Sequence, residues 1–177
     1  MAYKILKSET VFQGRAFRVQ HDEVLRPNGN STTIDTVVHI GAVAMVPVNA
    51  EGKVLLVRQY RHAARKALLE LPAGTLEEGE PPEDCAQREL REEAGVAPGQ
   101  LTKLAEFFLA PGYSTERMHI YLATDLRPES LPGDEDEALE LETLSMEQAF
   151  VGVRSGEIED AKTILGLFLA REYLKEK

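Results

Sequence analysis

From Tyr3 to Ile40 the pattern of apolar and polar residues favours β-strands. The segments TVFQ, AFRVQHDEVL and TTIDTVVHI are rich in the residues typical of strands. Between the last two, Pro27-Asn28-Gly29-Asn30 is a hairpin signal, because Asn-Gly accepts positive φ at both central positions. The pattern predicts a small antiparallel β extension over residues 1–40.

A second pair of strands is predicted around the turn Asn49-Ala50-Glu51-Gly52. The flanking segments AVAMVPV and KVLLVRQYR are almost continuously apolar, which indicates strands covered on both faces and joined as a hairpin. The order of elements predicts an α/β fold, with residues 41–177 as the main domain. The remaining predicted elements are strands at 101–109, 118–124 and 138–143 and helices at 82–94, 146–154 and 161–175.

The helix predicted at 82–94 carries carboxylates on one face. Proline and acidic residues occupy its first turn and Gly95 follows its end, as expected of helix termini. Glu89 and Glu93 are four residues apart and lie one above the other, with Glu92 beside them. Like charges at this spacing repel, so their grouping needs a reason beyond helix stability.

Composition narrows the classes of protein. The chain has 177 residues and a net charge of −10, which suits one domain with an extension and argues against nucleic-acid binding. The single Cys85 excludes an intramolecular disulfide. The longest apolar run, 41–48, is far too short to span a membrane, and the first residues lack the apolar stretch of a secretory signal. We therefore expect a cytoplasmic protein without membrane or nucleic-acid partners.

Half of the 30 acidic residues lie in two short segments, 70–95 and 134–142. Such clustering is usual for a solvated helix face or an acidic loop. The alternative is a divalent cation held among the carboxylates, where oxygen ligands favour Mg²⁺ or Mn²⁺ over zinc. The four histidines have no metal-motif spacing. Because Mg²⁺ commonly bridges carboxylates to substrate phosphates, phosphate chemistry is the leading hypothesis.

Residues 74–96 carry a specific resemblance. The sequence matches the pattern G-x5-E-x7-R-E-U-x-E-E-x-G-U, where U is apolar, without a departure. The match begins at Gly74, includes Glu80 and ends with RELREEAGV at residues 88–96. This resembles the Nudix box of hydrolases that cleave a nucleoside diphosphate linked to another moiety. The resemblance implies an α/β/α sandwich with a mixed sheet and a loop–helix–loop that bears the metal site.

The same resemblance assigns roles to the box residues. Glu89 and Glu93 would be metal ligands, Glu92 a further ligand directly or through water, and the Ala73 carbonyl another. Mg²⁺ is the expected cofactor, with Mn²⁺ or Zn²⁺ as substitutes. Arg88 and Glu80 would orient the carboxylates. We count Glu92, Glu93 and Arg88 with the catalytic group, and the alternative for Arg88 is a surface ion pair.

The flanking segments resemble the ADP-ribose pyrophosphatase subgroup. Pro111 lies sixteen residues after Gly95, and VRQYR, ELPAG and the N-terminal extension are also similar to that subgroup. The resemblance implies a homodimer that exchanges the extension, and hydrolysis of ADP-ribose to AMP and ribose 5-phosphate. A GDP- or UDP-sugar pyrophosphatase, a broad-specificity enzyme and a non-catalytic nucleotide-sensing module remain alternatives.

The acidic run at 133–137 resembles the catalytic loop of the same enzymes. Glu135 aligns with the glutamate that takes a proton from the attacking water, and Glu137 with an additional metal ligand. A repetitive run permits a shift of register, and a plain solvated loop is the alternative.

Five further residues are candidates for substrate binding. Arg61 and Arg58 could hold diphosphate oxygens through guanidinium hydrogen bonds. Phe17 and Tyr60 could stack on a base, although aromatic residues in strands more often serve packing. Glu116 could accept hydrogen bonds from a ribose hydroxyl, with a surface turn as the alternative.

Overall fold

The computed structural model describes residues 2–132 and 139–176 and divides into two compact units. The first unit comprises residues 1–41 and 107–117, and the second comprises 42–106 and 118–177. Backbone hydrogen bonds and an isolated bridge between Val37 and Ser114 connect residues 107–117 with the N-terminal strands.

The first unit is a three-stranded antiparallel sheet in the order β1-β2-β3. Gly29 has φ of 86° and donates its N–H to the Arg26 carbonyl, so the predicted hairpin turn is present between β2 and β3. The predicted antiparallel N-terminal extension is therefore confirmed. The strands are β1 (Lys4–Gln13), β2 (Phe17–Leu25) and β3 (Ser31–His39).

The second unit is an α/β/α arrangement with a mixed sheet, as predicted. In that sheet, of order β7-β4-β10-β9, β4 is parallel to β10 and antiparallel to β7. A second, antiparallel sheet has the order β12-β5-β6, and the short β8 and β11 pair with each other. The strands are β4 (Ala42–Pro47), β5 (Lys53–Arg61), β6 (Lys66–Glu70), β7 (Ala73–Thr75), β8 (Val96–Ala97), β9 (Gln100–Phe108), β10 (Arg117–Thr124), β11 (Arg127–Pro128) and β12 (Glu140–Ser145).

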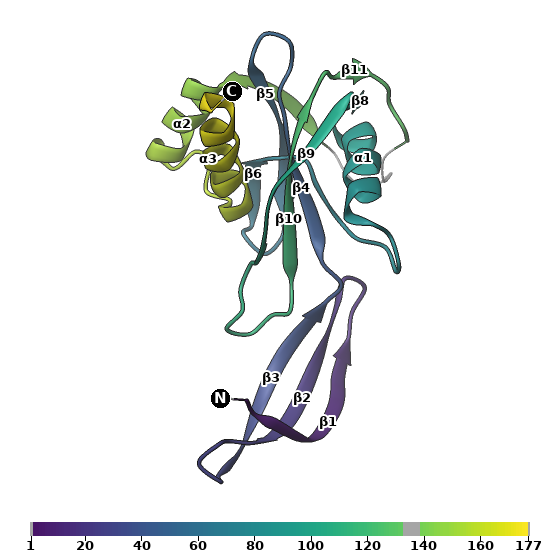
Figure 1. Cartoon of the computed structure of the whole chain (residues 1–177), viewed down its shortest axis with the longest axis vertical. Helices are drawn as coiled ribbons and strands as arrows, with labels where there is room; N and C mark the ends of the chain where they lie inside the picture. The colour runs from purple at the N-terminus through teal and green to yellow at the C-terminus, as the bar shows by residue number, and fades with distance from the viewer. Residues whose placement is uncertain (1, 133–138, 177) are drawn as a thin grey trace. The chain divides into compact units, whose positions relative to one another are not determined.

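Three helices cover the strands of the second unit: α1 (Pro82–Glu93), α2 (Met146–Ser155) and α3 (Ala161–Lys175). Figure 1 shows α1 on one side of β4 and β10 and the other two helices on the opposite side. Leu90 and Cys85 of α1 are fully buried against Met45 of β4 and Tyr121 of β10. This packing fixes one face of α1 and leaves its neighbouring face available for chemistry.

The turn after β4 is correctly predicted, but the hairpin is not. Gly52 donates its N–H to the Asn49 carbonyl, and a single bridge joins Val48 and Val54. Beyond that bridge, β4 and β5 diverge into different sheets. Both strands are apolar enough to be inner strands. The sequence therefore does not distinguish a β4–β5 hairpin from two strands that belong to separate sheets. No helix in the described part of the chain is long and apolar enough to cross a membrane.

Candidate active site around helix α1

Arg88 is the centre of the carboxylate group predicted from the sequence. Its Nε and Nη2 donate to the two carboxylate oxygens of Glu80, both at 3.0 Å. Its Nη1 donates to Glu89 at 2.6 Å and to Glu92 at 3.0 Å. The side chains of these four residues are 27% exposed or less. One guanidinium thus ties the loop before α1 to two carboxylates of the helix.

Glu80 is held in its charged form. The hydrogen bonds from Arg88 lower the pKa of Glu80 to about 2, against the opposing effect of desolvation. In turn, the bonds to Glu80 raise the pKa of Arg88 above its ordinary value. Glu80 also accepts the backbone N–H of Glu77 at 2.9 Å, which closes the loop that leads into the helix. This ion pair is a fixed structural element and not a group that titrates near neutral pH.

Gly74 lets the helix approach the strand. A Cβ atom at this position would lie 1.9 Å from both Cδ and Oε1 of Glu89, so any other residue would displace that carboxylate. Next to it, the backbone N–H of Ala73 donates to Oε2 of Glu93 at 2.9 Å. The backbone of β7 and two carboxylates of α1 therefore share one small region. The sequence identified these residues as parts of one motif. The fold shows that they also lie close together in space.

The donor set suits a hard divalent cation, although its present arrangement is not that of a finished metal site. Within residues 2–132 and 139–176, no three His, Cys, Asp or Glu side chains are grouped so that they could hold a metal ion. Nη1 of Arg88 contacts both Glu89 and Glu92, the carboxylates predicted as ligands. The oxygen chemistry and the backbone cradle at Gly74 fit such an ion.

Cys85 lies under the site and was not singled out by its sequence context as a functional residue. It is fully buried, and Nη2 of Arg88 lies 3.3 Å from its sulfur. Burial raises the pKa of this thiol well above its ordinary value, so the group stays protonated. Its role is packing beneath the arginine.

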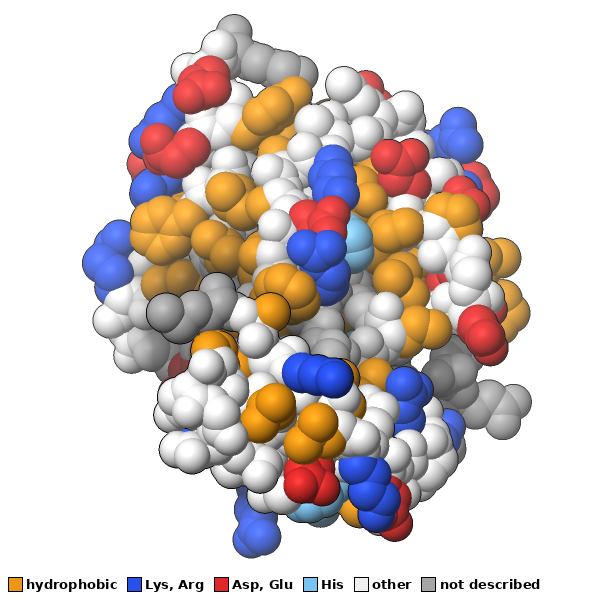
Figure 2. All heavy atoms as spheres, turned by 60° about the horizontal axis from the view of Figure 1, so that its bottom comes forward, with side chains coloured by type: hydrophobic (Ala, Val, Ile, Leu, Met, Phe, Trp, Pro, Cys, Tyr) orange, Lys and Arg blue, Asp and Glu red, His pale blue; other side chains and the backbone are white. Residues whose placement is uncertain are grey.

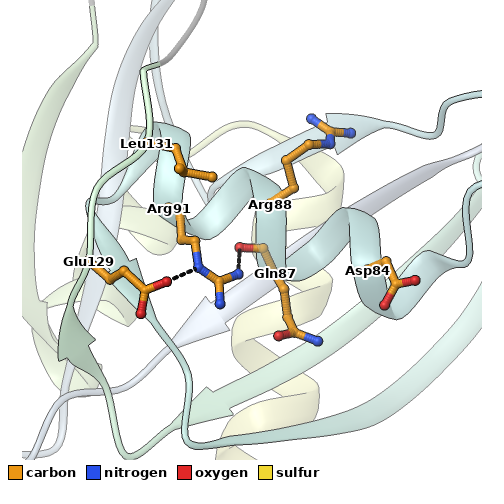
Figure 3. Close-up of a pocket in the computed structure, with 6 residues that line it drawn as sticks. All are labelled: Asp84, Gln87, Arg88, Arg91, Glu129 and Leu131. Atoms are coloured by element: carbon orange, nitrogen blue, oxygen red, sulfur yellow. Dashed lines mark hydrogen bonds and ion pairs between the residues drawn. The ribbon is translucent and has the colours of Figure 1, made fainter.

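A pocket beside α1 is lined by residues of the helix and of the chain after β11, namely Asp84, Gln87, Arg88, Arg91, Glu129 and Leu131. Nε of Arg91 donates to Glu129 at 2.7 Å and its Nη1 donates to the Gln87 carbonyl at 2.8 Å. Figure 3 shows Arg91 reaching toward Glu129, whereas Arg88 extends away from that pair. The backbone N–H of Leu131 also donates to the Arg91 carbonyl at 3.1 Å. These contacts tie the chain to α1 just before the acidic run; Glu135 and Glu137 lie outside the described residues.

The two arginines predicted to bind diphosphate lie in different groups. Nε of Arg58 donates to Glu142 at 2.6 Å, and its Nη2 lies 3.6 Å from Glu157. Arg61 forms two hydrogen bonds with Glu70 instead. Residues three apart on a strand point to opposite faces, which separates these side chains. Beyond the larger effect of its hydrogen bonds to Glu70, the charge of Glu93 of the box also raises the pKa of Arg61.

The remaining predicted contacts are exposed or partly exposed. The exposed fractions of Phe17 and Tyr60 are 41% and 60%, so neither belongs to the core. Phe17 packs near Phe12 within the first unit, with ring centroids 6.0 Å apart. Glu116 belongs to the turn before β10, where its N–H donates to the Ser114 hydroxyl at 3.1 Å.

Glu70 and Lys162 were missed as site residues. Glu70 was counted among the acidic residues, and its side chain is 1% exposed in the structure; that of Lys162 is 10% exposed. The usable signal was the context of Glu70, a carboxylate inside the apolar run Leu68-Leu69-Glu-Leu71. Lys162 gave no such signal, because a lysine near a helix start is ordinarily a surface residue.

Several known proteins are similar to this chain in sequence and in fold. A model of the NUDIX domain matches residues 38–166. An ADP-ribose pyrophosphatase from Bacillus subtilis (strain 168) is 38% identical over 176 residues, covering 98% of this chain and 93% of that protein. A methanol dehydrogenase activator from Bacillus methanolicus is 38% identical over 178 residues, covering 98% and 96%. A crystal structure of an ADP compounds hydrolase has a TM-score of 0.89 at 31% identity and covers 99% and 96%. The chain belongs to the NUDIX domain family.

Proposed function

We propose that this protein is a divalent-metal-dependent pyrophosphatase that hydrolyses ADP-ribose to AMP and ribose 5-phosphate. One observation carries the proposal: the complete box carboxylates gather around Arg88 and the cradle at Gly74. Similarity over nearly the whole chain to an ADP-ribose pyrophosphatase supports the substrate. A relative of equal identity is named a methanol dehydrogenase activator, so the carboxylates of the site, and not a relative's name, are the main support for hydrolysis.

Mg²⁺ is the proposed cofactor, and it would supply charge neutralisation of the diphosphate and activation of water. Glu89, Glu92, Glu93 and the Ala73 carbonyl would hold it. Nη1 of Arg88 contacts one oxygen of Glu89 and one of Glu92, so it would orient both carboxylates for the ion. Two hydrogen bonds to Glu80 anchor the same guanidinium.

The substrate's diphosphate is the proposed ligand of Arg61. Its side chain is 38% exposed although it is bound to a buried carboxylate, so donors of the guanidinium reach solvent. A planar guanidinium suits phosphate oxygens. For Arg58, whose bonds go to Glu142 and Glu157, we retain a weaker contribution to binding. Tyr60 and Phe17 are exposed enough to stack on a base, and Glu116 is the proposed partner of a ribose hydroxyl.

Proton removal from the attacking water is assigned to Glu135, with Glu137 as an additional metal ligand. Support comes from the resemblance of the acidic run and from the contacts of Arg91 and Leu131 that tether the chain just before it. Glu135→Gln should abolish kcat while Mn²⁺ binding is retained. If Glu137→Gln behaves that way instead, the register is shifted by two residues.

A homodimer built through the N-terminal strands is part of the proposal. All ten residues of β1 are exposed in the single chain, among them Ile5, Val11 and Phe12. Figure 2 shows hydrophobic side chains at the surface beside charged ones. A sheet with so little buried surface gains stability by pairing with a second copy. Analytical ultracentrifugation of the full chain tests this, and a monomer at micromolar concentration would contradict it. The cytoplasmic location stays a prediction.

The substrate test is a panel assay with Mg²⁺. It contains ADP-ribose, GDP-mannose, UDP-glucose, diadenosine polyphosphates and nucleoside triphosphates, and it compares kcat/KM. We expect ADP-ribose to have the highest value and to release AMP. A higher value for GDP-mannose or UDP-glucose would move the assignment to another nucleoside diphosphate sugar. Absence of nucleoside monophosphate from every diphosphate-linked compound would overturn the enzymatic proposal.

A further inference from the structure

Four charged side chains form a linked group at the ends of β5 and β6 and the start of α3. Nε and Nη2 of Arg61 donate to the two oxygens of Glu70 at 2.9 and 2.7 Å. Nζ of Lys162 lies 2.5 Å from Oε2 of Glu70 and 3.0 Å from Oδ2 of Asp160. Positive and negative groups alternate along this chain of contacts and are equal in number. We call these four residues the buried charge network.

The network is anchored at its far end by the helix start. Asp160 caps α3 by accepting the backbone N–H of Thr163 at 2.9 Å and its hydroxyl at 2.6 Å. The same hydroxyl oxygen accepts the backbone N–H of Leu71 at 2.8 Å. Lys162 is therefore held between a helix cap and the strand end that carries Glu70. Asp160 cannot move without disturbing the cap of α3.

The other end of the network reaches the box. Glu70 is followed by Leu71 and Pro72, and then by Ala73, whose N–H donates to Glu93. The pKa of Arg61 is raised by its hydrogen bonds to Glu70 and, to a lesser extent, by the charge of Glu93. A few residues of chain thus separate a fully buried carboxylate from the carboxylates proposed to hold the metal.

Burial makes the Glu70 contact rigid. A buried carboxylate is costly unless its oxygens are paired, and here the Arg61 and Lys162 donors satisfy both oxygens. An unpaired arginine on a strand end would instead keep its rotamer freedom. Two parallel hydrogen bonds also fix the plane of the guanidinium, and within the described residues Nη1 makes no hydrogen bond.

Lys162 changes how much of the Arg61 charge is neutralised. Glu70 shares its single negative charge between two cations, so Arg61 keeps part of its attraction for an anion. Asp160 pairs directly with Lys162 and makes no salt bridge to Arg61 within the described residues, although its charge helps to raise the pKa of Arg61. The outer end of the network therefore presents a fixed guanidinium near the box.

We propose that Glu70 and Lys162 are positioning residues that hold the Arg61 guanidinium in place to bind the substrate's diphosphate. The inference rests on the proposed function of this site and adds two residues that act through a third. Their effect should appear in substrate binding, because Arg61 contacts phosphate oxygens both before and during the reaction. Arg61 itself touches the substrate, whereas Glu70 and Lys162 do not.

A double-mutant cycle tests the proposal with the full-length protein, Mg²⁺ and ADP-ribose. Glu70→Gln should raise KM about tenfold and change kcat less than about threefold. In the Arg61→Ala background the same substitution should change KM less than about twofold, because its target is already gone. Equal effects of Glu70→Gln in both backgrounds would overturn the positioning role and leave a merely structural one.

A matched control is available in the same two elements. Lys66 of β6 forms an exposed ion pair with Glu159, just before α3, and this pair does not involve Arg61. Glu159→Gln should leave KM and kcat unchanged. A KM rise as large as that of Glu70→Gln would mean that any break between β6 and α3 suffices, which would overturn the proposal.

Lys162 provides a second route if Glu70→Gln folds poorly. Lys162→Met keeps the Arg61–Glu70 hydrogen bonds but removes the competing cation, so KM should rise about threefold. Lys162→Arg should restore most of the wild-type value. An unchanged KM in Lys162→Met, with a normal folded fraction by circular dichroism, would overturn the role of Lys162. If the wild type releases no AMP from ADP-ribose, the proposed function fails first and independently of this cycle.

Discussion

Two groups of charged residues lie close together in the second unit and are built on opposite principles. The group around α1 has four carboxylates, those of Glu80, Glu89, Glu92 and Glu93, and its guanidinium is that of Arg88. The buried charge network has two carboxylates and two cations, and its central Glu70 is more deeply buried than Glu80, Glu89 or Glu92. In the buried charge network, equal numbers of opposite charges stabilise one another. The excess of carboxylates around α1 needs an additional cation to neutralise it.

The electrostatic logic follows from solvation. Deep burial of a charge is tolerated when a partner compensates it, as in the buried charge network. Partial exposure lets water screen repulsion until a cation arrives, as in the α1 group. An excess of carboxylates over cations on a helix face is therefore a sign of chemistry, and a balanced group of charges is a sign of positioning. Four substitutions test this distinction.

Removing one carboxylate of the α1 group should have the largest effect on activity. Glu93→Gln removes a proposed ligand charge but can keep a hydrogen bond with the Ala73 N–H, so we expect turnover to fall roughly a thousandfold. Thermal unfolding should change little. Initial rates at saturating Mg²⁺ check this, and normal turnover would contradict the metal assignment.

Glu80 should control an acid-dependent part of stability. Its folded pKa is about 2, lowered from an ordinary value of 4.5 chiefly by Arg88. The stabilisation is therefore fully present above about pH 4.5 and is lost as the pH falls toward 2, worth roughly 3 kcal/mol at most. Urea unfolding between pH 5 and 2.5 should show a shallower pH dependence for Glu80→Gln than for wild type. Parallel curves would show that Glu80 is not paired in this way.

Neutralising Glu70 should destabilise the fold, in contrast to the α1 group. Glu70→Gln leaves Arg61 and Lys162 without their shared anion and should lower the free energy of unfolding by about 2–3 kcal/mol. This is less than for a fully buried pair, because Arg61 is 38% exposed. Glu92→Gln, measured by the same urea titration without divalent ions, should change the free energy of unfolding by less than about 0.5 kcal/mol. Equal losses in both variants would remove the distinction between the groups.

Gly74→Ala tests the backbone cradle of the α1 group. The new methyl group would collide with the Glu89 carboxylate, so activity should fall about tenfold to a hundredfold through a displaced ligand. Gly112→Ala is the matched control, since a Cβ there meets nothing within 4 Å. Steady-state kinetics at several Mg²⁺ concentrations should show that excess metal rescues part of the loss. Wild-type kinetics in Gly74→Ala would mean that Glu89 does not depend on this approach.

The sequence predicted what is local and periodic. The helix expected at 82–94 is observed as Pro82–Glu93, and the expected last helix, 161–175, is observed as Ala161–Lys175. Local signals set these bounds: proline in the first turn of α1 and a glycine with φ of 65° after its end. The short strands β6 and β7 were not predicted, because Pro72 and Gly74 interrupt the pattern that long strands show.

Contacts between distant segments could not be predicted. Lys162 and Glu70 are 92 positions apart in the sequence, and the residues around Lys162 do not predict that the two form an ion pair. Arg58 and Arg61 both lie on β5 and point to opposite faces, but which carboxylate each one meets depends on the strands that pair with β5, which are β12 and β6. The box residues were predictable because their spacing on one helix fixes their relative positions.

Direct metal binding tests the central claim that the excess carboxylates around α1 form a cation site. Mn²⁺ titration of the substrate-free protein, followed by electron paramagnetic resonance, should reveal saturable binding in the wild type. Glu93→Gln should weaken the affinity at least about tenfold, whereas the control Glu159→Gln should match the wild type. If Glu93→Gln binds Mn²⁺ as tightly as the wild type, the α1 group is not the cation site.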